Sequence, residues 1–267
     1  MRGRTALITG STAGLGLAAA SALAEQGCNI IMTGLGEATE IESNRRSIED
    51  DHGVAVNYIF ANLEKPQEIE DLVAAAYEAF GSIDILINNA AVRHTSPVED
   101  FKPSHWDQDI AVNLSAAFHL IRLTLRGMKA ANWGRIINIS SNLGMFGAPN
   151  RVGYVTTKTA LIGLTRAIAM ETAGTDITCN AICPSAMLGE NAANLITQIM
   201  VNEGISREAA TEAFLASRNR GRFVTTVPAM IVFLCSDNGR DMTGAAIPID
   251  LGSTAGQPAT ATGPTTR

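Results

Sequence analysis

The sequence predicts an α/β protein with one doubly wound domain, about seven parallel strands and helices on both faces. Three observations predict this class. Strand-length apolar runs alternate with helix-length amphipathic segments along the chain. The strand candidates are apolar throughout, as expected for strands that helices cover on both faces. A glycine-rich turn at residues 9–16 follows the first of them, where a doubly wound (Rossmann) fold binds a dinucleotide.

The pattern places each element in order. Strands are expected at 5–9, 29–33, 56–61, 83–88, 134–140, 177–183 and 245–250. Helices are expected near 15–27, 40–53, 66–80, 104–130, 153–173, 206–217 and 226–236. Strand–helix alternation of this kind indicates right-handed crossovers between parallel strands.

No linker or internal repeat divides the 267 residues, so we expect a single domain over 1–253. Residues 254–267 are small, polar and rich in Pro and Gly, which predicts a disordered tail. Residues 186–221 interrupt the alternation after the sixth strand. An insertion there is expected to form a substrate lid, and the alternative is a peripheral helix pair.

Composition excludes several classes of function. The net charge is −6 and no basic stripe appears, so nucleic acid is not an expected partner. No apolar run is long enough for a membrane span, and the first residues do not have the pattern of a signal peptide. The four cysteines are expected to be reduced and buried, and their spacing matches no metal site. We therefore expect a cytoplasmic protein without a metal.

The glycine-rich turn reads T9-G-S-T-A-G-L-G16 and opens a helix. Gly10, Gly14 and Gly16 let the backbone approach a ligand where a Cβ would collide. The free N–H groups and positive dipole end of the helix then face that ligand, which predicts a pyrophosphate site.

The end of the second strand reads T33-G-L-G-E37. No Asp stands at its tip to bind a ribose 2′-hydroxyl. No Arg or Lys follows directly to hold a 2′-phosphate, and Ala13 in the glycine turn is not basic either. The absence of a cation favours NAD over NADP as cofactor.

Residues 153–161 read G-Y-V-T-T-K-T-A-L and place Tyr154 and Lys158 four apart. On a helix these two side chains share a face. One interpretation is a surface helix whose Lys covers an aromatic ring. The other is a proton donor beside a cation.

Six motifs decide between them: T9-G-S-T-A-G-L-G16, N88-N-A-A91, Asn113, Ser141, Y154-x-x-x-K158 and C183-P-S185. Their order and spacing resemble the short-chain dehydrogenase/reductase family over residues 3–252. Segments such as H94-T-S-P-V-E-D-F101 and T178-C-N-A-I-C-P184 look like the bacterial D-3-hydroxybutyrate dehydrogenases of that family.

The resemblance implies roles for four residues. Tyr154 would be the general acid/base, and the charge of Lys158 would lower its pKa. Ser141 would orient and polarise the carbonyl; Ser140 is its rival, but the family spacing selects Ser141. Asn113 would hold a water that links Lys158 to solvent.

The resemblance also implies the cofactor contacts. They are Gly10, Ser11, Thr12, Gly14, Leu15, Gly16, Leu35, Asn62, Leu63, Asn89, Ala90, Val112, Tyr154, Lys158, Pro184 and Met187. Asn62 stands where the family usually has an Asp that touches the adenine amine, and its side-chain carbonyl can accept that bond. Ser185 replaces the usual Gly after Pro184.

Three positions correspond to the family's carboxylate contacts: Arg93, Leu143 and Arg151. None matches the 3-hydroxybutyrate pattern of Gln, His and Lys. Two are arginines, which clamp carboxylates well, so we expect a small anionic substrate. The alternative is that both arginines face solvent or carboxylates at a subunit interface.

The sequence therefore predicts an NAD-dependent oxidoreductase that interconverts a secondary alcohol and a ketone on a 3-hydroxybutyrate-like acid. Alternatives are a neutral alcohol, sugar or 3-oxoacyl thioester as substrate, or a non-catalytic dinucleotide-binding sensor. His94 is expected to have a structural role. The family also implies a homotetramer, with the helices at 104–130 and 153–173 at its interfaces.

Overall fold

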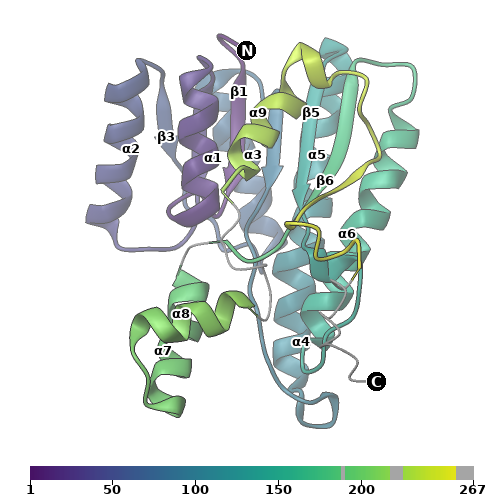
Figure 1. The fold of residues 1–267 in the computed structure, drawn as a ribbon. Helices are drawn as coiled ribbons and strands as arrows, with labels where there is room; N and C mark the ends of the chain where they lie inside the picture. The colour runs from purple at the N-terminus through teal and green to yellow at the C-terminus, as the bar shows by residue number, and fades with distance from the viewer. Residues whose placement is uncertain (188–189, 217–224, 257–267) are drawn as a thin grey trace, which may run out of the picture.

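A computed structural model describes residues 1–187, 190–216 and 225–256, and in this part of the chain seven strands form one parallel sheet (Figure 1). The strands are β1 (Thr5–Thr9), β2 (Asn29–Thr33), β3 (Val56–Tyr58), β4 (Ile85–Asn88), β5 (Gly134–Ile139), β6 (Ile177–Pro184) and β7 (Ala246–Ile249). Their order is β3-β2-β1-β4-β5-β6-β7. The predicted fold class is confirmed.

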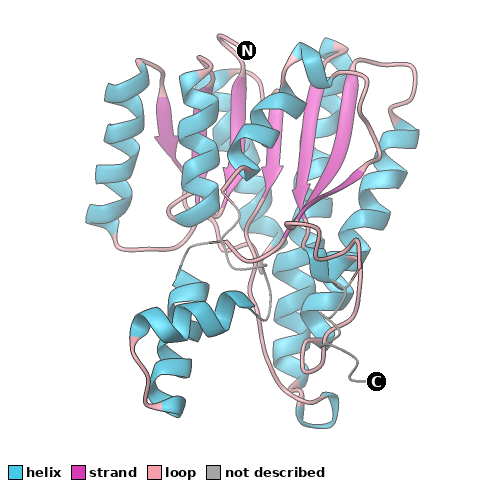
Figure 2. Ribbon diagram, viewed as in Figure 1, coloured by secondary structure: helices cyan, strands magenta, loops and turns pink. Residues whose placement is uncertain are grey.

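Helices cover both faces of the sheet (Figure 2). They are α1 (Gly14–Glu25), α2 (Ala38–His52), α3 (Pro66–Phe80), α4 (Pro103–Ile110), α5 (Ala116–Ala131), α6 (Val152–Glu171), α7 (Glu190–Glu203), α8 (Arg207–Ala216) and α9 (Val227–Cys235). Of the described helices, none is both long and apolar enough to cross a bilayer.

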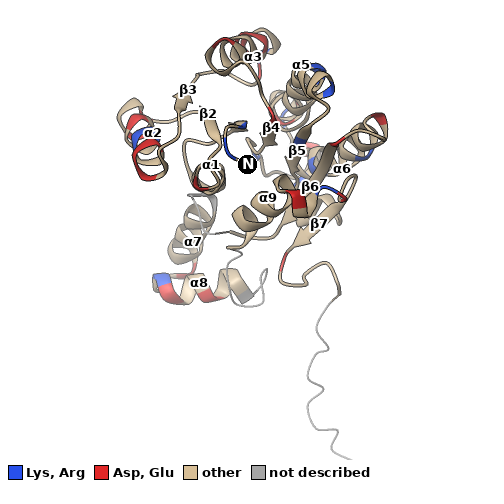
Figure 3. Ribbon diagram, turned by 90° about the horizontal axis from the view of Figure 1, so that it is seen from above, with Lys and Arg blue, Asp and Glu red and all other residues tan. Residues whose placement is uncertain are grey.

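Two apolar cores hold these layers together. Side chains of α1, α2 and α9 pack on one face of the sheet, and side chains of α3, α5 and α6 pack on the other. Figure 3 shows the two layers edge-on, with acidic and basic residues spread along the outer helices. The central strands β1, β5 and β6 are buried along their whole length, which explains why their residues are mostly apolar without alternation.

The sequence order of the strands reverses direction at β1. From there the chain adds β2 and β3 on one side and then β4 to β7 on the other. Doubly wound sheets bind ligands at this switch point, outside the carboxyl ends of the strands. The turn after β1 and the loop after β4 therefore meet at the expected ligand edge.

The expected helix over 104–130 is confirmed as one continuous helical run, in which a π-helical turn at Ala111–Ser115 joins α4 to α5. One helix was missed. No helix was predicted at α7, although Ala192, Ile196 and Ile199 have helical spacing there. These three residues pack in a small core that α7 shares with α8.

The pair α7 and α8 lies beyond the carboxyl edge of the sheet in Figure 1. This is the helix pair of the alternative interpretation, in the place that a lid needs. Residues 188–189 and 217–221 of the proposed lid lie outside the described residues, as do residues 257–267 of the expected tail. The lid and the tail both stay predictions.

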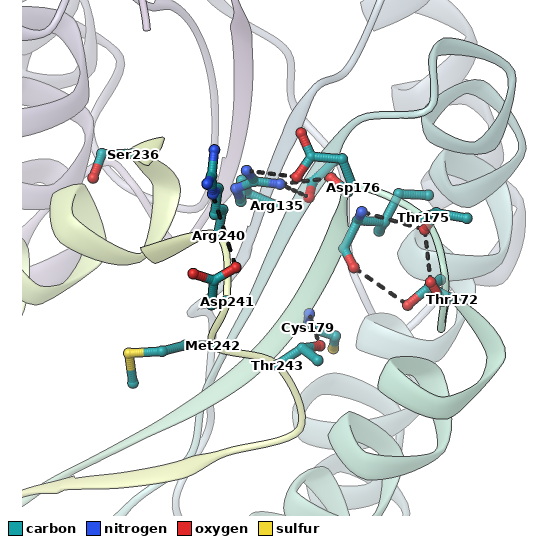
Figure 4. Close-up of polar contacts among 12 residues, drawn as sticks. Arg135, Thr172, Thr175, Asp176, Cys179, Ser236, Arg240, Asp241, Met242 and Thr243 are labelled. Carbon is teal, nitrogen blue, oxygen red and sulfur yellow. Dashed lines mark hydrogen bonds and ion pairs between the residues drawn. The ribbon is translucent and has the colours of Figure 1, made fainter. Parts of the chain in front are cut away.

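The amino ends of β5 and β6 are joined by a buried arginine (Figure 4). Arg135 has no exposed surface and donates to the backbone oxygens of Gly134 at 2.9 Å and Asp176 at 2.7 Å. It also pairs with the Asp176 carboxylate at 3.3 Å. A buried charge needs such partners, and here they fix the sheet at the edge opposite the predicted site.

Candidate functional site

The glycine turn lies at the carboxyl end of β1 and leads into α1. Gly10 and Gly14 have φ values of 63° and 57°, a region that favours glycine. A Cβ on Gly16 would collide with the backbone of Gly10 and with the side chain of Asn89. The turn therefore has the conformation and close packing that a phosphate-binding backbone requires.

Buried and half-buried polar side chains hold this turn through hydrogen bonds to its backbone. Ser11 is fully buried and donates to the backbone oxygen of Ile8 at 2.8 Å. The side chain of Asn89 donates to the oxygens of Thr9 at 2.8 Å and Gly10 at 3.1 Å. The hydroxyl of Ser11 and the side-chain amide of Asn89 are thus engaged with the protein and hold the shape of the turn.

The loop after β4 lies at the same edge of the sheet and contains two of the predicted cofactor contacts, Asn89 and Ala90. The backbone N–H groups of Asn89 and Ala90 both donate to the hydroxyl of Thr9, at 2.9 and 3.0 Å. These bonds hold the loop after β4 against the turn after β1. A dinucleotide at the switch point would contact both segments at once.

The predicted adenosine end is more open. Leu35 is 74% exposed at the tip of β2, and its backbone oxygen accepts a hydrogen bond of 2.6 Å from Thr12. Asn62 and Leu63 are half-buried after β3. The Asn62 side-chain oxygen already accepts from the N–H of Glu64 at 3.0 Å, which leaves it one lone pair for an adenine amine.

Four further predicted contacts lie at other points along this edge. Pro184 ends β6 and is buried, while Met187 packs against the core that includes α1. Val112 is half-buried in the π-helical turn. Leu15, at the start of α1, is half-buried too.

Tyr154 and Lys158 are both buried on α6, with exposed fractions of 5% and 2%. The Lys158 Nζ lies 5.6 Å from the centroid of the Tyr154 ring and donates to the backbone oxygen of Ile139 at 2.7 Å. The structure therefore brings the phenol and the ammonium together, as their spacing predicts.

The charges around Tyr154 favour its ionised form. Burial has the largest effect and raises the pKa of Tyr154, but the charges of Lys158 and Arg93 lower it, and so do hydrogen bonds from Arg93 and Ser141. The pKa of the phenol lies below its ordinary value as a result. Burial, together with the charge of Arg93, also lowers the pKa of Lys158 against the opposing effect of Tyr154.

The two candidate serines have different partners. Ser140 donates to the backbone oxygen of Lys158 at 2.7 Å, so its hydroxyl anchors α6. Ser141 donates to the Asn142 side-chain oxygen at 3.2 Å and accepts from the N–H of Leu143 at 3.1 Å. This geometry favours Ser141 as the hydroxyl available to a substrate, which would replace Asn142 as its acceptor.

Asn142 also connects Ser141 to the chain after β7. Its amide donates to the hydroxyl of Ser253 at 3.4 Å, and Ser253 donates to Asp250 at 3.0 Å. Asp250 further accepts from the N–H of Thr254 at 2.7 Å. A turn at residues 250–254 therefore supports the segment that carries Ser141.

Asn113 lies in the π-helical turn and is 2% exposed. Its side chain accepts from the N–H of Val92 at 2.8 Å and donates to the oxygen of Val92 at 3.0 Å. It also donates to Thr157 at 3.3 Å. The amide thus clamps the loop after β4; its proposed water-holding role stays a prediction. Single π turns of this kind are frequent at functional sites.

The predicted substrate residues lie at different places around the site. Arg93 lies over Tyr154 and donates to its hydroxyl oxygen at 2.9 Å. Leu143 is half-buried next to Ser141, and Arg151 is half-buried where α6 begins. Of the two arginines, Arg93 contacts the predicted acid/base directly.

A cavity of about 340 Å³ opens beside this arginine. It is lined by Ala91, Val92, Arg93, His94, Gln108 and Tyr154. The volume is at the lower end of the range for small-ligand sites, so it suits a small substrate.

Gln108 and Asp109 were not predicted, because nothing in the α4 sequence distinguishes them from surface residues. Asp109 is fully buried, and its Oδ1 lies 3.0 Å from His94 Nδ1. His94 stacks on His105 with ring centroids 4.0 Å apart. A Cβ on Gly153 would collide with the Asp109 carboxylate, so that glycine is required beside Tyr154. These contacts support a structural role for His94, which stays a prediction.

The sequence of this chain was compared with protein families and with known proteins. A family model described as short chain dehydrogenase matches residues 4–199. The D-beta-hydroxybutyrate dehydrogenase of Cupriavidus necator is 42% identical over 255 residues, which cover 94% of this chain and 98% of the relative.

Solved structures of related enzymes have the same fold as this chain. NAD+-bound xylitol dehydrogenase superposes with a TM-score of 0.84 at 28% identity, covering 94% of this chain and 99% of that one. Actinorhodin polyketide ketoreductase with NADPH has a TM-score of 0.87 at 29% identity, covering 93% and 96%.

Proposed function

Because the chain belongs to the short-chain dehydrogenase family and is an oxidoreductase, we propose that it interconverts a small anionic hydroxy acid and the corresponding keto acid with NAD. The proposal rests on one observation: Arg93, a cation, lines a small cavity and donates to Tyr154. The similarity to a D-beta-hydroxybutyrate dehydrogenase supports a substrate of the 3-hydroxybutyrate type.

Each residue of the site has a proposed task. Nicotinamide dinucleotides supply a hydride acceptor or donor, and the turn at 9–16 and the loop after β4 would hold the pyrophosphate and ribose. In oxidation, the Tyr154 phenolate takes the proton of the substrate hydroxyl. Ser141 donates to the same substrate oxygen and polarises the carbonyl that forms. Lys158 keeps the phenol ionisable and would also donate to the nicotinamide ribose.

The substrate carboxylate is proposed to bind Arg93 and Arg151, with Leu143 as an apolar wall. A guanidinium has five N–H donors, so Arg93 can hold a carboxylate oxygen while it donates to Tyr154. Arg151 is half-buried at the start of α6, three residues before Tyr154, which supports a second contact. We further propose a homotetramer with interfaces on α5 and α6, where Phe118 and Met170 are exposed.

The preference for NAD is argued from the tip of β2. Leu35 is exposed between Gly34 and Gly36, and no basic side chain belongs to these three residues. A 2′-phosphate placed there would find no cation among them to pair with. The related structures with NAD+ and with NADPH make this a question for measurement.

Leu35→Arg is expected to shift the ratio of kcat/KM for NADP over that for NAD upward by about tenfold or more, because a charge-assisted hydrogen bond to the 2′-phosphate is worth roughly 1.5–3 kcal/mol. Leu35→Gln is the matched control, since it has a similar length and no charge. The preference is measured with both cofactors at one fixed substrate concentration. An equal ratio in the arginine and glutamine variants would show that Leu35 does not face the ribose.

The proposed substrate is tested by initial rates with NAD and, separately, NADP on D-3-hydroxybutyrate, other hydroxy acids and neutral alcohols. A strong NAD-linked rate with D-3-hydroxybutyrate is expected. A rate with another acid alone would mean that Arg93, Leu143 and Arg151 have changed the pocket. Turnover of neutral alcohols alone would remove the anionic-substrate proposal.

A further inference from the structure

We propose that Arg93 is a second cation that holds Tyr154 in its phenolate form, acting beside Lys158. The guanidinium nitrogen is 2.9 Å from the Tyr154 oxygen. The Arg93 Cζ lies 4.4 Å from the ring centroid, whereas the Lys158 Nζ lies 5.6 Å away. This inference rests on the proposed role of Tyr154 as acid/base.

Arg93 is held in this position by its neighbours on both sides. Val92 is clamped through its N–H and its oxygen by the buried amide of Asn113. His94 is tied to the buried carboxylate of Asp109 at 3.0 Å. Arg93 itself is exposed, but the residues on either side of it are fixed. The contact with Tyr154 is therefore built into the loop after β4.

Because Tyr154 is buried, a second cation near its hydroxyl should have a strong effect on its ionisation. The phenol is 5% exposed, and burial without a nearby positive charge would favour the neutral form. Lys158 directs one hydrogen bond to Ile139, whereas Arg93 donates to the phenol oxygen itself. Asp109 lies against the same helix one residue earlier, at Gly153.

Other described ionisable groups near the pair do not replace Arg93. Cys183, on β6, faces Lys158, and burial raises the pKa of this thiol. His94 lies on the cavity wall and is bound to Asp109. Among the charged groups in the described part of the chain, Arg93 and Lys158 are thus the two that lower the pKa of Tyr154.

The proposal can be tested in the free enzyme without substrate or cofactor, because the chain has only three tyrosines. Burial raises the pKa values of Tyr58 and Tyr77, so Tyr154 should be the first phenol to ionise as pH rises. Its phenolate is followed by ultraviolet difference absorbance against pH. Tyr154→Phe should remove this first ionisation and so assigns it.

Arg93→Gln and Arg93→Lys form the matched pair. Gln retains a hydrogen-bond donor without charge, and Lys retains the charge. Because an opposite charge within about 4–6 Å lowers a pKa by roughly 1–3 units, and Arg93 is partly screened by solvent, Arg93→Gln should leave about tenfold less phenolate at a pH below the transition. Arg93→Lys should retain most of it. The circular dichroism of each variant checks that it is folded.

The outcomes distinguish a failure of the proposed role of Arg93 from a failure of the proposed role of Tyr154. A first ionisation that is unchanged in Arg93→Gln, or that moves equally in the Gln and Lys variants, would overturn the role of the Arg93 charge. An early ionisation that survives in Tyr154→Phe would instead remove the proposed role of Tyr154. The pH profile of kcat/KM, which reports the pKa of the free enzyme, should move with the absorbance transition, which a purely structural role of Arg93 would not produce.

Discussion

Tyr154→Phe is expected to lower kcat/KM by at least about a hundredfold and up to about ten-thousandfold, the usual contribution of a general acid/base, while the Kd for NAD changes little. The ring still fills its buried position, and only the proton carrier is lost. Steady-state rates measure the loss of turnover, and cofactor titration measures the Kd for NAD. A loss of turnover without a loss of NAD binding would also separate an enzyme from a dinucleotide sensor.

Tyr77→Phe is the control, because its hydroxyl reaches only the oxygen of Thr124 at 3.5 Å, away from the site. It should retain full turnover. In the unmodified enzyme, the rate of alcohol oxidation should rise with pH through the lowered pKa of Tyr154 and then level off, since the phenolate is the active form. Ketone reduction should fall over the same range. A Tyr154→Phe enzyme with a normal rate would contradict the proposed chemistry.

Gly16→Ala is expected to weaken dinucleotide binding by roughly ten- to a hundredfold. The new Cβ would overlap the backbone of Gly10 and the side chain of Asn89, and relieving such overpacking costs about 1–3 kcal/mol. The buried face of α1 fixes the helix in place. The glycine turn must therefore move to remove part of the overlap. Calorimetric titration with NAD measures the change, and thermal unfolding reports any loss of stability.

Gly163→Ala is the matched control for this substitution. Gly163 also lies within a helix, but a Cβ added there would meet no atom of the described chain within 4 Å. Alanine there should stabilise the helix slightly and leave the Kd for NAD unchanged. Equal affinities in the Gly16 and Gly163 variants would mean that the turn at 9–16 does not hold the cofactor.

Much of the fold could be predicted because the central strands are buried along their whole length and are therefore mostly apolar. β1 and β2 match their predicted bounds. The π-helical turn between α4 and α5 could not be predicted, since it contains Asn113, which bonds to Val92 twenty-one residues away. Periodicity describes local structure and contains no information about such a contact.

The site was predicted to a different extent at each residue. The spacing of Tyr154 and Lys158 on one helix is local, so the sequence contains it. The contact of Arg93 with Tyr154 joins residues 61 positions apart, and only the sheet order brings them together. The inward direction of the Ser11 and Asn89 side chains likewise follows from packing against β1 rather than from any motif.

The bond between Asn142 and Ser253 has a consequence for the order of protein synthesis. Ser141 is supported by a turn at residues 250–254, and β7 pairs in register with β6 beside it, Pro184 against Ile249. A ribosome makes these C-terminal residues long after Ser141. A nascent chain that already has its glycine turn, Tyr154 and Lys158 therefore still lacks part of the support for Ser141. Dinucleotide affinity should thus appear earlier during synthesis than turnover.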